Sequence, residues 1–280
     1  GIGGGICAWN SQHIEIRNTI FKQNYAYVKA AAVYIRDIRY LININSSYID
    51  NNAAWGRKDT GTIVGAIGIY VAKLVLNINC LFTHNKGVDT AVIYHYDIQK
   101  TKSSYCKFFH NKASKGGTYY IDIRNKSSTH TIYGCLFGRN LVHQNRGLIS
   151  IVNERNKAEI GTVLIVHTVF PNNRIAFSSV VHLYKVLNVL MEKLYFLKNY
   201  DRSMRHGSVI YFDSCSNISL CQTMFTFNIG RDGGGVLSVH CVHLHVYKCA
   251  FIGNAASRYA GGICCRDGGE IKVIKTVFVN

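Results

Sequence analysis

The sequence predicts an all-β protein, a right-handed parallel β-helix of about ten rungs that spans residues 1–280 as one domain. Three observations support this prediction. An aromatic residue followed three positions later by Asn recurs along the chain, a pair of small residues precedes these aromatics, and short runs of alternating apolar and polar residues lie between them. The helical period of 3.6 residues is not sustained anywhere in the chain.

The aromatic and Asn signature sets the repeat length. Successive aromatics from Phe21 to Phe278 are 26 to 34 residues apart, enough for three short strands and their corners. We expect each aromatic to fill a rung and stack on the next one. Asn suits a corner because it tolerates left-handed backbone angles, and stacked amides can form a ladder. The predicted ladder includes Phe21 with Asn24, Phe82 with Asn85, Phe108 with Asn111, Phe137 with Asn140, Phe225 with Asn228 and Phe251 with Asn254.

The small residues mark a second corner of each rung. Gly4-Gly5, Ala31-Ala32 and Gly261-Gly262 each precede an apolar run, and small residues permit a tight corner close to the neighbouring rung. Polar inserts at 125–130 and 153–159 interrupt two of the units. We expect these inserts to form loops at one edge of the coil.

Composition indicates a folded protein with a basic surface. The chain is 48% hydrophobic and 17% charged, with a formal net charge of +17, which is expected to attract polyanions. No signal peptide, initiator Met or transmembrane helix is visible. Because the chain starts and stops within a repeat, we expect it to be an interior fragment of a longer array.

The cysteines follow the repeat rather than a metal-binding pattern. Four of the ten occupy the position two residues before the aromatic, where other rungs have Thr or Ser. This slot is typical of small inward-facing side chains, so we expect buried thiols. The chain contains no zinc-type Cys-x-x-Cys pattern, and no cofactor is predicted.

The paired motifs resemble the repeats of the polymorphic outer membrane proteins of chlamydiae. Similar repeats occur in surface proteins of parasitic protists, trichomonads among them. The matching positions are Gly4-Gly5-Ile6 with Phe21 and Asn24, Gly65-Ala66-Ile67 with Phe82 and Asn85, and Gly261-Gly262-Ile263 with Phe278. This resemblance implies a right-handed β-helical protein on a cell surface or secreted, with adhesion as its role.

One group of polar residues suggests catalysis. When the units are aligned on the small pair, Asp213, His240 and Asp267 fall on consecutive rungs, and we expect a lateral stack with its carboxylates about 9.6 Å apart. Inverting glycoside hydrolysis uses a separation of about 6.5–9.5 Å. The alternative is that these residues end strands and cap corners, as Asn and Asp do elsewhere.

Three other groups suggest binding or modification. His243 and His245 alternate with apolar residues and could hold a transition metal, or could simply lie on a solvated strand face. The densest basic segment is expected either to bind polyanions or to keep strand edges from aggregating; it contains Lys100, Lys102, Lys107, Lys112 and Lys115. Glycosylation sequons occur at Asn45, Asn125 and Asn217.

Three functions follow as hypotheses. The first is a non-enzymatic surface-exposed or secreted scaffold that binds host or matrix glycans or proteins, because the sides of a repeat rod are rigid binding surfaces. The second is a β-helical glycoside hydrolase or polysaccharide lyase. The third is a polyanion-binding rod, with nucleic acid not expected as its ligand. Membrane association is expected only through regions outside this sequence.

Overall fold

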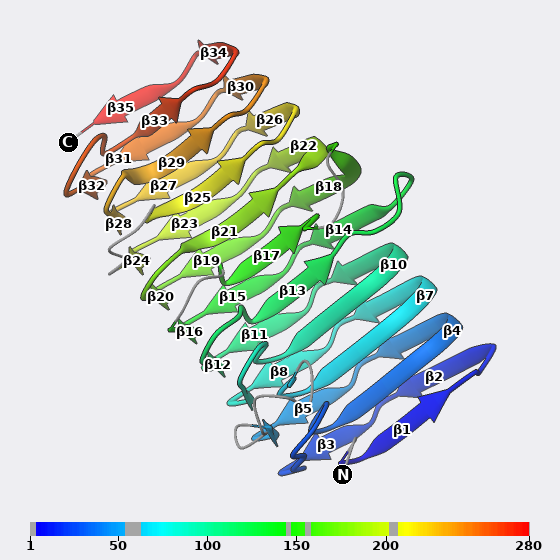
Figure 1. Cartoon of the computed structure of the whole chain (residues 1–280). Helices are drawn as coiled ribbons and strands as arrows, with labels where there is room; N and C mark the ends of the chain where they lie inside the picture. The colour runs from blue at the N-terminus through cyan, green and yellow to red at the C-terminus, as the bar shows by residue number, and fades with distance from the viewer. Residues whose placement is uncertain (1–3, 54–62, 144–146, 155–157, 202–206, 280) are drawn as a thin grey trace.

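The computed structural model describes residues 4–53, 63–143, 147–154, 158–201 and 207–279, and it shows a parallel β-solenoid of about nine turns (Figure 1). The rungs follow one another in chain order along a rod. The described residues contain no helix, and therefore none that could span a membrane. The all-β parallel coil of about ten rungs is confirmed. Its right-handed sense stays a prediction, favoured because crossovers between parallel strands are right-handed in about 98% of cases.

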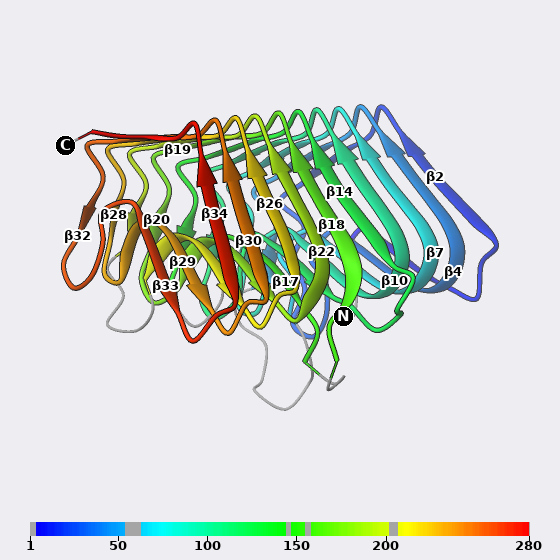
Figure 2. The same cartoon turned by 90° about the horizontal axis from the view of Figure 1, so that it is seen from above.

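The first sheet forms the widest face of the coil and contains 17 strands. Three rungs cross this face with one strand of 12 residues, in which Asp37, Val71 or Asp97 has the positive φ of a corner, and the others use two shorter strands with a corner between them. Figure 2 shows these strands side by side along the rod. The strands are β1 (Ile6–Trp9), β2 (His13–Arg17), β4 (Val33–Ile44), β7 (Ile67–Ile78), β10 (Ile93–Ser104), β13 (Tyr119–Asp122), β14 (Thr129–Tyr133), β17 (Ile149–Val152), β18 (Ile160–Val166), β21 (Ser179–Tyr184), β22 (Val186–Glu192), β25 (Ser208–Asp213), β26 (Asn217–Cys221), β29 (Gly233–Val239), β30 (His243–Tyr247), β33 (Ile263–Arg266) and β34 (Glu270–Ile274).

The second sheet carries the aromatic signature and contains ten strands of three residues. In each of these strands the central residue points inward and its two neighbours point outward, as the period of two requires. The strands are β3 (Ile20–Lys22), β5 (Ser47–Ile49), β8 (Leu81–Thr83), β11 (Lys107–Phe109), β15 (Leu136–Gly138), β19 (Val169–Pro171), β23 (Tyr195–Leu197), β27 (Met224–Thr226), β31 (Ala250–Ile252) and β35 (Val277–Val279).

The third sheet consists of eight two-residue strands that follow the Asn of the signature. The second residue of each strand points inward, and the first points outward. The strands are β6 (Asn52–Ala53), β9 (Lys86–Gly87), β12 (Lys112–Ala113), β16 (Leu141–Val142), β20 (Arg174–Ile175), β24 (Tyr200–Asp201), β28 (Ile229–Gly230) and β32 (Ala255–Ala256).

Two ladders run along the inside of the rod. Aromatic rings from Phe21 to Phe278 stack with centroids 4.3 to 5.4 Å apart on successive rungs. Beside them, each Asn binds the next. The Asn111 backbone N–H and Nδ2 both donate to Asn140 Oδ1 at 3.0 Å, and Asn140 Nδ2 donates to the Phe108 carbonyl at 2.9 Å. The ladder therefore satisfies buried polar groups at every corner between the second and third sheets.

The thiols behave as small core side chains. Cys80, Cys106, Cys135 and Cys249 are buried in the slot before the second sheet, and all ten cysteines are free. The insert at 125–130 leads from β13 into β14. The insert at 153–159 lies between β17 and β18, and residues 155–157 lie outside the described residues.

Candidate functional site

The corner between the second and third sheets presents a column of polar side chains. Each corner residue has a positive φ of 50–58° and donates its backbone N–H to a carbonyl of the next rung. Because every rung turns here in the same way, these side chains point outward one above another. From the third to the seventh rung the column consists of His84, His110, Arg139, Asn172 and Lys198, all exposed.

A second column lies beside it, on the outward positions of the third sheet. Lys86 pairs in register with Lys112, which pairs in turn with Leu141. The same column continues through Arg174 to Tyr200. We call the basic members of both columns the basic edge: His84, Lys86, His110, Lys112, Arg139, Arg174 and Lys198.

The basic edge is a run of one sign of charge. Of its ten outward positions on five rungs, five hold Lys or Arg, two hold His and none holds a carboxylate. The corner column has Asp50 before this run and the exposed, apolar Phe227 after it. Five rungs at a spacing of about 4.8 Å give the run a length of about 19 Å.

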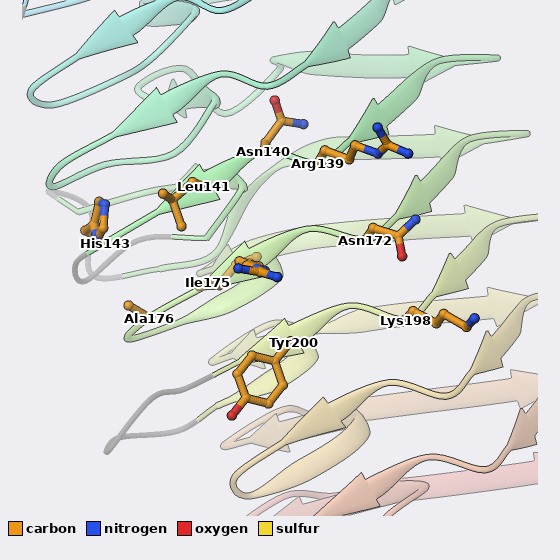
Figure 3. A pocket seen from close by; sticks show the side chains of 10 residues that line it. Arg139, Asn140, Leu141, His143, Asn172, Ile175, Ala176, Lys198 and Tyr200 are labelled. Atoms are coloured by element: carbon orange, nitrogen blue, oxygen red, sulfur yellow. The ribbon is translucent and has the colours of Figure 1, made fainter.

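A groove of about 930 Å³ lies over the C-terminal half of this edge. Arg139, Asn172 and Lys198 follow one another along one side of it, with Leu141 and Tyr200 nearby on the third sheet (Figure 3). The remaining lining residues are Asn140, His143, Arg174, Ile175 and Ala176. The groove therefore combines three permanent cations with an apolar strip.

Two histidines extend the edge toward the N-terminus. The rings of His84 and His110 stack with centroids 5.0 Å apart and planes inclined by 8°. Partial burial, the neighbouring His84 and the charge of Arg139 lower the pKa of His110 below its usual value. Proton uptake by His110 is therefore resisted by the other cations, and a bound anion would favour it.

The Asn ladder holds this edge in place from the inside. Asn85, Asn111, Asn140, Asn173 and Asn199 lie between the two outward columns and bond to one another across the five rungs. Their side chains are buried and fully tied to backbone and amide partners. A ligand would thus meet cations mounted on a rigid backbone, which reduces the ordering cost of binding.

The structure separates the lysines of the basic segment that the sequence singled out. Lys100 and Lys102 extend outward from the first sheet, Lys107 from the second and Lys112 from the third. Lys115 follows the third sheet and is also exposed. One rung winds around all three faces, so these residues do not form one patch. Of the five, only Lys112 belongs to the basic edge.

Asp213, His240 and Asp267 meet at a different corner. His240 Nδ1 is 3.9 Å from Asp213 Oδ1, and His240 Nε2 is 3.8 Å from Asp267 Oδ2. The expected alignment is wrong by one residue, because Asp213 pairs in register with Val239 and Ser214 takes the corner position.

The shift has a local cause. Between Ser208 and Ile210 the register slips by one, because the next rung has one more residue between the partners Gly233 and Val236. The small pairs of the two rungs are therefore not equivalent. An alignment on these pairs shifts the residues from Ile210 to Asp213 by one position relative to their partners in the next rung.

The chemistry available to this trio is limited by its exposure. The side chains of His240 and Asp267 are 60% and 64% exposed, and that of Asp213 is 24% exposed. Asp213 also accepts hydrogen bonds from Tyr211 at 3.1 Å and Ser214 at 2.8 Å. Hydrolytic sites gain their electrostatic strength by excluding water, so this corner resembles a set of solvated ion pairs. Its catalytic role stays a hypothesis.

His243 and His245 both point outward from β30, as their alternation with apolar residues predicts. His243 Nδ1 lies 3.5 Å from Glu270 Oε2, and Lys272 Nζ lies 2.9 Å from Glu270 Oε1. Among the described residues, no three His, Cys, Asp or Glu side chains gather closely enough to hold a metal ion.

The three sequon asparagines are exposed. Asn125 lies in its insert, where its Oδ1 accepts a hydrogen bond from the Ser127 backbone at 2.9 Å. Asn45 and Asn217 each bond to an Asn of the adjacent rung at 3.0 Å, Asn79 and Asn188 respectively. Glycosylation at these positions stays a prediction.

No protein family, curated protein or solved structure matches the chain. The sequence and structure of this chain are therefore the basis for its fold and its candidate sites. The basic edge escaped sequence reasoning because its members are separated by whole repeats. Alignment of the units on the aromatic residue, rather than on the small pair, places Arg139 and Lys198 at equivalent positions.

Proposed function

We propose that this protein is a non-enzymatic binding rod that holds a polyanionic partner along the basic edge. The observation that carries the proposal is the run of five Lys or Arg and two His on ten outward positions, with no carboxylate among them. Like charges mounted on adjacent rungs repel one another, and a polyanion relieves that repulsion.

Some of the carboxylates of the rod lie on another part of its surface. Asp37, Asp97 and Asp267 lie at the corner within the first sheet, away from the basic edge. The net charge of +17 would draw a polyanion to the rod from a distance, and the basic edge is where it would settle. Adhesion at a cell surface, to host or matrix glycans, is the role that the repeat resemblance implies, and we include it in the proposal.

Heparin binding tests this function directly. The triple variant R139Q/R174Q/K198Q removes three charges from the groove, and K100Q/K102Q/K107Q removes three charges from other faces, so both have the same net charge. We expect the groove variant to elute from immobilised heparin at clearly lower salt, with a salt slope of log Kd reduced by roughly three. The control variant should elute close to the wild-type protein. Equal weakening by the two variants would show that binding follows net charge alone and would overturn the proposal.

A further inference from the structure

We infer that the ligand of the basic edge is an anionic polysaccharide that lies lengthwise in the groove, parallel to the rod. This inference rests on the proposed function and specifies its ligand. It follows from three features of the described residues: the spacing of the cations, the apolar strip beside them, and the kinds of cation that line the groove.

The permanent cations are spaced at one per rung. Lys86, Lys112, Arg139, Arg174 and Lys198 belong to five successive rungs. Lys86, Lys112 and Arg174 lie in the third-sheet column, and Arg139 and Lys198 lie in the corner column. A ligand along the rod thus meets one cation about every 4.8 Å. Duplex DNA carries one charge per about 1.7 Å of its axis, nearly three for each cation of the edge. A chain with about one anionic group per rung fits the row better.

The groove also offers apolar surface beside each cation. Leu141 and Ala176 are partly exposed, and Tyr200 is 38% exposed. Binding sites for sugars and other small organic groups combine such surfaces with a few placed polar groups, and the C–H faces of sugar rings can pack on them. Single-stranded nucleic acid relies on aromatic side chains for successive bases, yet among the described residues Tyr200 is the only Phe, Tyr or Trp that lines this groove.

Two of the three permanent cations that line the groove are arginines, and the third is Lys198. Arg139 and Arg174 are in adjacent rungs. Their guanidinium groups can bind a sulfate or carboxylate through two parallel hydrogen bonds, which a lysine cannot do. The amide of Asn172 and the ring of His143 also line the groove and can bond to hydroxyl groups. Together these groups match a sugar chain that carries both anions and hydroxyls.

Calorimetry with five defined probes tests the inference. The probes are a heparin-derived oligosaccharide, a hyaluronan oligosaccharide, linear polyphosphate, a short DNA duplex and an oligothymidylate, each at two salt concentrations. The first two separate sulfate from carboxylate as the recognised anion. Two variants probe the groove without removing charge: R139K/R174K, and Y200A, whose exposed ring makes the substitution compatible with folding. Circular dichroism and the thermal midpoint confirm that each variant is folded.

We expect one or both glycans to bind, and both variants to weaken that binding about 3- to 10-fold. Polyphosphate binding should change less than 2-fold in Y200A. If all five probes bind alike and respond only to R139Q/R174Q/K198Q, the glycan inference is overturned while the polyanion function stands. If no probe binds, or the groove triple variant binds as tightly as wild type, both proposals fail.

Discussion

Two histidines inside the coil make the fold sensitive to acid. His95 in β10 is fully buried, and neither of its ring nitrogens has a hydrogen-bond partner among the described residues. His130 in β14 is also buried and bonds through Nδ1 to Thr101 Oγ1 at 3.1 Å. Burial lowers the pKa of both rings from 6.5 to about 3, with the neighbouring His130 contributing at His95.

The direction of the pH effect follows from these lowered pKa values. Below pH 6.5 the unfolded chain takes up a proton at each histidine, whereas the folded rod keeps both rings neutral until about pH 3. The free energy of unfolding therefore falls as the pH falls, by up to about 1.4 kcal/mol per pH unit for each ring. Between pH 7 and pH 5 this amounts to about 2 kcal/mol per histidine, or about 4 kcal/mol for the pair.

Substitutions taken from neighbouring rungs isolate this contribution. His95 lies between Ile69 and Ile121 in register, and His130 pairs with Val163. The variant H95I/H130V should lose most of the acid-dependent destabilisation. H95I alone should be more stable at pH 7 by about 1–3 kcal/mol, because a buried polar group without a partner is removed.

Urea unfolding at pH 7 and pH 5 measures both effects, and H245Q, which changes an exposed histidine, is the control. Repeat arrays can unfold in parts, so amide hydrogen exchange in β10 and β14 should accompany the urea curves. If the double variant loses as much stability on acidification as wild type, the assignment of acid sensitivity to these two rings is wrong.

Three further predictions concern the ladders and the edge. N140A should destabilise the rod by at least about 3 kcal/mol. The substitution leaves both Asn111 donors and the Phe108 carbonyl without their hydrogen-bond partner. N217A, on the surface, should cost under about 1 kcal/mol in the same urea assay. F137A should cost about 3–5 kcal/mol, since its ring is fully buried between two others; a loss comparable to that of N217A would contradict the stacked core. Heparin retention should rise as the pH falls from 7.5 to 5.5, because a bound anion offsets the cations that lower the pKa of His110 and so favours proton uptake by its ring. H110Q should reduce that rise, and an unchanged rise in this variant would exclude His110 as its source.

The fold was predictable because the repeat appears in the sequence as a regular spacing of a few residue types. An aromatic every 26 to 34 residues, with Asn three positions later, is enough to predict rungs that stack in parallel. The rungs differ in length, but the aromatic residue recurs in each of them, so the period survives. The slip between Ser208 and Ile210 was not predictable in the same way. Gly233, Gly234 and Gly235 offer several equivalent pairs, and only backbone pairing decides among them.

The candidate site was harder to predict because, in a solenoid, residues that are close in sequence can lie on different faces of one rung. Lys100 and Lys112 are close in sequence, yet their side chains leave different faces of one rung. Arg139 and Arg174 are 35 residues apart and line one groove. A cluster of charges in the sequence therefore belongs to one rung and is spread over its faces. The basic edge instead consists of residues at equivalent positions of successive rungs.

The location of a bound ligand tests the central claim most directly. Side-chain Nε–Hε resonances of arginine, recorded by NMR during titration with a heparin-derived oligosaccharide, report each guanidinium separately. We predict that Arg139 and Arg174 shift together with saturation, while Arg36 and Arg258, on other parts of the rod, do not shift. Equal shifts at all four arginines, or shifts at Arg36 and Arg258 alone, would contradict a polyanion site on the basic edge.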